Sequence, residues 1–226
     1  MSQLSWLSGG AQDTALAQRA KAQERLRIDG PALDVRELPS FGFSHRSLMW
    51  WGTLGLMGIE GTVFGLAIMA YFFLRSHVAI WPMNEPPPEL RWGTLNTVIL
   101  LASLWPNHLA KRAGERLDRR GVQIWLSVCL AMSVLFLGVR WLEFENLNTR
   151  WDSDAYGSIV WLLMGLHTLH LITDTWDTGV LTALVHTGPL EGKRFVDVSE
   201  NALYWYFVVW SWLPIYAVVY GAPYWV

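Results

Sequence analysis

The stretch AYGSIVWLLMGLHTLHLITDTWDTGVLTALV, residues 155–185, decides the fold class of this chain. It is long and apolar enough to cross a membrane as one helix, which takes about 20 residues. Four ionisable residues follow one another within it at spacings of 3, 4 and 3 positions: His167, His170, Asp174 and Asp177. On a helix these side chains fall within an arc of roughly 80°. Because ionisable groups in a membrane helix face protein or water and not lipid, the stripe predicts a polar interior shared with other helices.

The composition agrees with a membrane protein. The 226 residues are 52% apolar and include 15 Trp, a residue that gathers at membrane interfaces. Charged residues make up 16%, against roughly 25% in soluble domains. The net charge of −2 argues against a nucleic-acid partner. The single cysteine, Cys129, cannot form an intrachain disulfide, and we expect it to be a small apolar core residue.

Five apolar segments reach or approach the length of a membrane span. We expect the spans at residues 48–74, 92–110, 121–142, 155–185 and 201–223. The second is the shortest and least apolar, and the fourth is long enough to tilt or project. Residues 1–47 are predicted to be a polar N-terminal arm, in which residues 11–27 form either a short helix or a mobile segment. The sequence therefore predicts an all-α membrane protein, with one domain of five transmembrane helices over residues 48–226.

The positive charges predict the orientation of this bundle. Thirteen of the 17 Lys and Arg residues fall on one side: six in the arm, five in residues 111–120, and Lys193 and Arg194. The other side is left with Arg75, Arg91, Arg140 and Arg150. Because cytoplasmic loops carry the excess of Lys and Arg, we expect a cytoplasmic N-terminus and a C-terminus outside.

Glu60 is the strongest single candidate for a functional residue, because it lies in the middle of the first span in the sequence Gly58-Ile59-Glu60-Gly61. One interpretation is a proton-linked group. The other is a structural hydrogen bond to a neighbouring helix, since polar groups in membranes often hold helices together. On a different face, Gly61-x-x-x-Gly65 predicts that another helix approaches closely.

A metal site receives little support from the spacing. His167-x-x-His170 is half of a ligand set, but helix bundles that hold two metals also need Glu-x-x-His pairs from other helices, and the spans contain none. We therefore expect no catalytic, cofactor-binding or metal-ligating residue in this chain. Asp174 and Asp177 are predicted to lie toward the cytoplasmic side, either on a proton path or in contacts between helices.

Taken in order, the spans resemble subunit III of the haem-copper respiratory oxidases, in its five-helix bacterial form. The resemblance covers roughly residues 48–222 and rests on an ordered series of motifs. These are Glu60 with Phe64 and Tyr71-Phe72-Phe73; Trp81-Pro82; Leu95-Asn96-Thr97-Val98-Ile99-Leu100 with Ser103; Glu143-Phe144; Tyr156-Gly157-Ser158; Gly165-x-His167-x-x-His170; and Glu200 with Tyr204-Trp205-x-Phe207-Val208 and Trp212. Two positions depart from it: Tyr206 stands where the family usually has His, and Val209 where it usually has Asp.

The resemblance implies a non-catalytic subunit of a terminal oxidase in aerobic respiration. Its polar residues within the membrane would be Glu60, Asn96, Glu143, His167, His170 and Glu200. Haems and copper would belong to partner subunits, and bound phospholipid would be possible. The implied partners are the catalytic subunit I, other oxidase subunits and membrane lipids, in the bacterial inner membrane. Such a subunit packs on the catalytic subunit and supports proton uptake and sustained turnover.

Three other functions remain open on the sequence. One is an accessory protein of a nitric oxide reductase, which resembles the same family. Another is a stand-alone membrane metalloenzyme that uses Glu60, His167 and His170. The third is a small proton-coupled transporter, although the chain lacks the inverted repeats of that class. The electron donor of an oxidase, cytochrome c or quinol, is also left open.

Overall fold

The computed structural model describes residues 42–83, 86–189 and 191–224. Every regular element in this part of the chain is helical, and the long ones are α2 (Leu48–Ser76), α3 (Leu90–Glu115), α4 (Arg119–Glu145), α5 (Ala155–Thr187) and α6 (Gly192–Tyr216). The predicted all-α membrane fold with five long helices is confirmed. Most of the predicted N-terminal arm, up to residue 41, lies outside the described residues.

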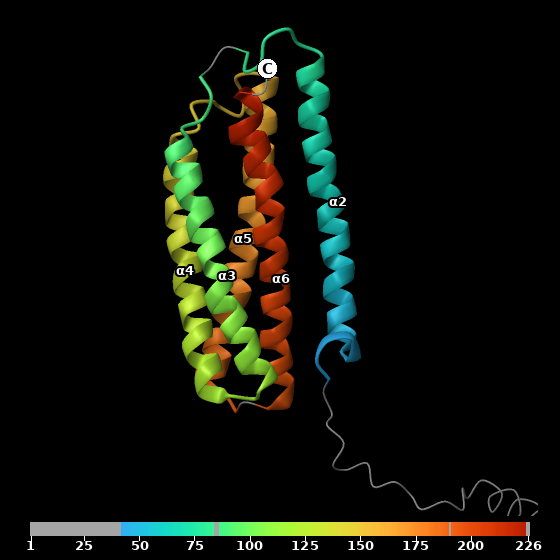
Figure 1. Cartoon of the computed structure of the whole chain (residues 1–226), viewed down its shortest axis with the longest axis vertical. Helices are drawn as coiled ribbons and strands as arrows, with labels where there is room; N and C mark the ends of the chain where they lie inside the picture. The colour runs from blue at the N-terminus through green and yellow to red at the C-terminus, as the bar shows by residue number, and fades with distance from the viewer. Residues whose placement is uncertain (1–41, 84–85, 190, 225–226) are drawn as a thin grey trace, which may run out of the picture. The chain divides into compact units, whose positions relative to one another are not determined.

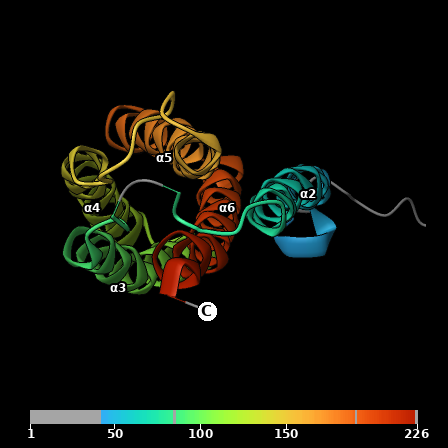
Figure 2. The same ribbon diagram turned by 90° about the horizontal axis from the view of Figure 1, so that it is seen from above.

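Successive helices run in opposite directions (Figure 1). Seen from above, α3, α4, α5 and α6 surround a common centre, and α2 lies on the outside of this group (Figure 2). Helix α2 packs on α5 and α6, while α3 packs on α4 and α6. The centre is filled by side chains that are completely buried, among them Leu163, Met164, Val208 and Trp212. Because apolar side chains fill most of the interior, the polar groups buried there must form hydrogen bonds with one another.

Helix α3 has the length of a span but not its composition. Four of the long helices are apolar enough to cross a membrane by length and composition, and α3 is the exception. Four of its polar residues are turned inward and buried: Asn96, Thr97, Ser103 and Asn107. These side chains bond mainly to neighbouring helices, as Asn107 does by donating to the backbone oxygen of Ala202 at 3.0 Å. A low mean hydropathy is therefore compatible with a helix inside the bundle.

The last helix begins earlier than the sequence predicted. We expected the span to start at residue 201, but α6 starts at Gly192 and carries Lys193 and Arg194 in its first turn. After Pro214 the helix continues as a π-helix, η2 (Ala217–Gly221), and a 3-10 turn, η3 (Ala222–Tyr224). The apolar pattern misses the start because the first turns of α6 are polar.

The connection between α4 and α5 is held by short-range polar contacts. Arg150 donates to both oxygens of the Asp152 carboxylate, at 3.0 and 3.1 Å, and these bonds lower the pKa of Asp152. The side chain of Asp154 then caps α5 by accepting from the backbone N–H of Gly157 at 2.8 Å. The cap fixes where the long α5 begins.

The predicted close approach at Gly61-x-x-x-Gly65 is not found in the described part of the chain. A Cβ added at Gly65 or at Gly58 would meet nothing within 4 Å, and one at Gly61 would meet only the ring of Phe207, at 3.7 Å. Helix α2 stands outside the group of four helices (Figure 2), and Gly58 and Gly65 are exposed on its surface.

Candidate functional site

A buried ion pair lies near the end of α4. Arg140 and Glu143 are each 1% exposed, and Nη1 of the guanidinium is 2.9 Å from Oε2 of the carboxylate. The residues are three positions apart, which places them on one face of the helix. The predicted span 121–142 includes Arg140, which was counted among the positive charges of the outer side. Its side chain is buried between helices and is balanced by Glu143.

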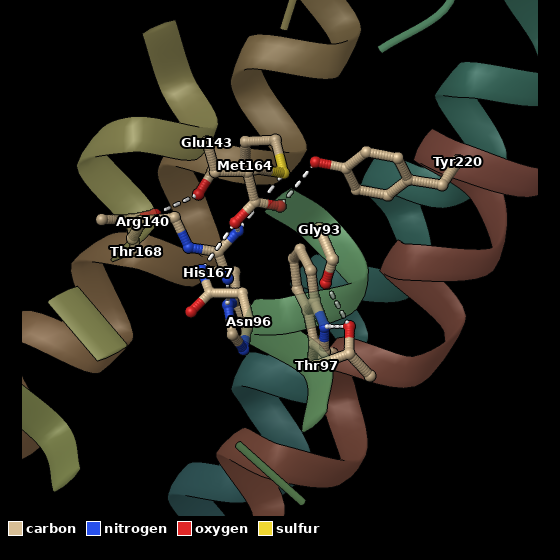
Figure 3. Close-up of polar contacts among 10 residues, drawn as sticks. Gly93, Asn96, Thr97, Arg140, Glu143, Met164, His167, Thr168 and Tyr220 are labelled. Atoms are coloured by element: carbon tan, nitrogen blue, oxygen red, sulfur yellow. Dashed lines mark hydrogen bonds and ion pairs between the residues drawn. The ribbon is translucent and has the colours of Figure 1, made fainter. Parts of the chain in front are cut away.

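The Glu143 carboxylate also joins α4 to two other elements. Asn96 of α3 donates to Oε2 at 2.6 Å, and the hydroxyl of Tyr220 in η2 donates to Oε1 at 2.5 Å (Figure 3). Tyr220 reaches this position because Gly93 has no side chain, and a Cβ there would overlap the tyrosine ring. Both carboxylate oxygens are therefore satisfied, as a buried charge requires.

The Arg140 guanidinium extends the contacts to α5 and α6. Its Cζ lies 4.1 Å from the ring centroid of Trp212 and 4.9 Å from that of Phe136. The faces of aromatic rings attract cations. Its Nη2 is 3.4 Å from Nδ1 of His167. We call Asn96, Arg140, Glu143, His167 and Tyr220 the inner cluster.

His167 uses both of its ring nitrogens inside the inner cluster. Nε2 is 3.1 Å from the backbone oxygen of Val208, which can only accept, so we assign the proton to Nε2. Nδ1 then accepts from Arg140. The ring also packs against Trp212, with centroids 4.8 Å apart. With both nitrogens engaged and a guanidinium beside Nδ1, this histidine is not arranged to share a metal cation with Glu60 and His170.

Glu60 belongs to a second group of polar residues, between α2, α5 and α6. Tyr204 donates its hydroxyl to Oε2 of Glu60 at 2.7 Å, and Nε2 of His170 lies 3.5 Å from Oε1. The other nitrogen of His170, Nδ1, is 2.7 Å from the backbone oxygen of Leu166. We call Glu60, His170 and Tyr204 the Glu60 cluster. Its contacts join α2 to the rest of the bundle, and a proton-linked role for Glu60 stays a prediction.

The structure divides the polar stripe of α5 among three surroundings. His167 enters the inner cluster and His170 the Glu60 cluster. Asp174 is 3% exposed, and it lines a groove of about 640 Å³ together with Asp177 and Glu200. Glu200 on α6 is 6% exposed. A shared helix face thus did not place the four residues in one site, because His167, His170 and the two aspartates face different groups of neighbours.

Three residues of these clusters were not predicted as part of the polar interior: Arg140, Tyr204 and Tyr220. The spacing Arg140-x-x-Glu143 within an apolar segment was a usable signal, since opposite charges three positions apart face each other on a helix. For the tyrosines no such signal exists, because their partners come from distant parts of the chain.

The two positions that depart from the family pattern lie in different surroundings. The hydroxyl of Tyr206 is 3.1 Å from Nδ1 of His108, and Val209 is completely buried in the apolar core. Across residues 42–83, 86–189 and 191–224, no group of three or more His, Cys, Asp or Glu side chains is arranged to hold a metal ion.

The described residues form helices only, and four of these helices are long and apolar enough to cross a membrane, which defines a multi-pass membrane protein. Comparison with known proteins identifies its family. The sequence profile of "Cytochrome c oxidase subunit III" matches residues 60–226. The "Cytochrome c oxidase subunit 3" of Thermostichus vulcanus is 28% identical over 177 residues, which are 78% of this chain and 88% of that protein. The "Probable cytochrome c oxidase subunit 3" of Mycobacterium bovis is 31% identical over 184 residues, covering 75% and 85% of the two chains.

The chain therefore belongs to the cytochrome c oxidase subunit III family. The predicted resemblance is confirmed, and it places the chain among the subunits of respiratory haem-copper oxidases. The apolar helices make it a multi-pass membrane protein, and its bacterial relatives support the inner membrane as its location.

Proposed function

We propose that this chain is the non-catalytic subunit III of a terminal haem-copper oxidase. It packs on the catalytic subunit, which holds the haems and copper, and supports proton uptake and sustained turnover. The observation that carries the proposal is the family match, which extends from Glu60 in the middle of α2 to the end of the chain. It therefore includes all of the polar residues that join the helices.

The contacts of the inner cluster support a structural role for its residues. Glu143 and His167 use their polar atoms to connect α3, α4, α5 and α6. Such groups stabilise helix packing in a membrane by forming hydrogen bonds between helices. The geometry of His167 offers no support to the stand-alone metalloenzyme, because its Nδ1 faces a cation.

Large apolar side chains on the outer faces support burial against lipid and partner subunits. On α2, Ile59, Leu66, Met69 and Phe73 are each at least 60% exposed. On α4, Trp141 is 70% exposed. A helix that is apolar on its outward side needs a membrane or another protein to cover it.

The orientation proposed from the charges is a cytoplasmic N-terminus and a C-terminus outside. Because Glu143 balances Arg140 within the bundle, Arg75, Arg91 and Arg150 are the remaining positive charges counted on the outer side, against thirteen on the other. Reporter fusions to each terminus, read in intact cells, test this orientation.

Extraction of the native protein tests the function. A tagged chain, solubilised in mild detergent, should retain a subunit with haem absorbance in the reduced-minus-oxidised spectrum, and mass spectrometry should identify it as an oxidase catalytic subunit. Recovery of the chain with a nitric oxide reductase catalytic subunit would favour that alternative. Recovery without any haem-bearing partner would contradict both.

A further inference from the structure

The groove between α2, α5 and α6 carries an inference beyond packing. Its volume is about 640 Å³, and its lining runs from Met49, Leu184 and Arg194, near helix ends, to Glu60 and Tyr204 further inside. Met49 lies at the start of α2, Leu184 in the last turn of α5, and Arg194 in the first turn of α6. These three helix ends lie at the same end of the bundle (Figure 1), so the groove reaches that end.

The lining is strongly acidic. It contains five carboxyl side chains and one cationic side chain, Arg194; the carboxyls belong to Glu60, Asp174, Asp177, Asp197 and Glu200. Arg194 pairs with Asp197 at 3.5 Å, and Glu60 has Tyr204 and His170 as partners. Asp174, Asp177 and Glu200 are left without a cationic side chain in salt-bridge contact among the described residues.

Two of these carboxyl groups are buried with oxygens that have no hydrogen-bond partner. Oδ2 of Asp174 and both side-chain oxygens of Glu200 accept no bond from any described residue. Their residues are only 3% and 6% exposed. Buried polar atoms are almost always bonded to protein or to ordered water. An ionised carboxyl group needs hydrogen-bond donors and a protonated one also needs an acceptor; water supplies both, and the groove has room for several waters.

The inner end of the groove is closed. Phe64, one turn beyond Glu60 on α2, is 4% exposed, and its ring centroid lies 4.9 Å from that of His170. It also packs against Phe207, with centroids 6.3 Å apart. The aromatic rings therefore separate the groove from the inner cluster and the opposite end of the bundle.

We propose that this groove is a water-filled inlet for protons and small cations, open at one membrane face and ending at Glu60. Water bonds the free carboxyl oxygens, and the excess of acidic groups concentrates cations over anions. The inlet is a property of this chain alone. Its use in proton uptake rests on the proposed function, whereas its existence does not.

Cysteine accessibility tests the inlet in the full chain, with Cys129 replaced by Ala as background. Thr53→Cys and Thr173→Cys place a thiol in the lining. Ile59→Cys on α2 and Leu169→Cys on α5 are matched controls, because these residues are 67% and 61% exposed but lie outside the groove. Membrane-impermeant methanethiosulfonate reagents, one cationic and one anionic, are added to either face of sealed vesicles.

The two groove cysteines should react from one face only, and faster with the cationic reagent by about tenfold or more. Both controls should stay unreactive, because lipid-facing thiols do not ionise. Adding Asp174→Asn and Glu200→Gln should make the groove cysteines react with the cationic and the anionic reagent at similar rates. Unreactive groove thiols, reaction from both faces, or equal rates for the two reagents with the acids intact would each overturn the inlet. Haem co-purification is unaffected by these outcomes, so failure of the inlet and failure of the proposed function are distinguishable.

Discussion

Removing the negative charge of the buried pair is the most informative change to this structure. In Glu143→Gln, the Arg140 guanidinium remains 1% exposed but loses its only carboxylate partner within 4.0 Å among the described residues. The amide can still accept from Tyr220 or Asn96, so shape and volume are nearly unchanged. The substitution therefore leaves a buried, uncompensated positive charge at nearly constant volume, and it also removes one of the two acceptor oxygens.

The expected cost is large. Removing one partner of a buried ion pair typically destabilises a protein by about 3–5 kcal/mol. Two interactions remain to reduce it, namely the Trp212 ring 4.1 Å from Cζ and Nδ1 of His167 at 3.4 Å. A cation over a desolvated aromatic ring gains roughly 2 kcal/mol. These interactions already exist in the parent chain. They keep the guanidinium in place in the variant, but they do not compensate for the lost carboxylate.

A double-mutant cycle measured by unfolding in mixed detergent micelles provides the assay. Arg140→Met combined with Glu143→Gln removes both charges, so the double variant should be more stable than Glu143→Gln alone by about 1–3 kcal/mol. Two results would refute the reasoning. One is a cost below about 1 kcal/mol for the single variant; the other is additive losses in the cycle.

Three further predictions concern neighbouring contacts. Tyr220→Phe should lower the free energy of unfolding by about 1.5–3 kcal/mol, because a hydrogen bond to a carboxylate is lost. Gly93→Ala should lower it at least as much, because the added Cβ overlaps the same ring. Equal stability of parent and variants in micelle unfolding would count against both. Glu60→Gln should leave co-purification of haem-bearing partners intact, since an amide oxygen still accepts from Tyr204, and loss of the whole complex would show that the charge itself is required. Asp154→Ala should cost about 1 kcal/mol by removing the cap of α5, and an unchanged unfolding curve would contradict the capping role.

The membrane fold could be predicted because apolar length is a local property. The segments at 48–74 and 155–185 lie within α2 and α5 almost from end to end. Segment 92–110 is less apolar because it contains Asn96 and Asn107, which are buried inside the bundle. Hydropathy does not record whether a side chain points inward or outward. The start of α6 escaped prediction because its first turns are polar yet helical.

The polar interior was predictable in kind but not in its connections. Of the stripe from His167 to Asp177, His167 and Asp174 are buried and His170 is half-buried, whereas Asp177 is exposed. Which residue meets which partner depends on contacts between distant segments, such as Glu60 with Tyr204, 144 positions away. Arg140 shows the limit most clearly. The predicted span ended at residue 142, one position before Glu143, so the buried partner of Arg140 was left outside the span.

The central claim is that this chain holds helices together while catalysis occurs in a partner subunit. Oxygen and nitric oxide consumption, measured for the purified chain and for the complex it extracts with, tests that claim most directly. The account predicts oxygen consumption by the complex with a reduced electron donor, and none of either gas by the chain alone. Turnover of oxygen or nitric oxide by the isolated chain would contradict it.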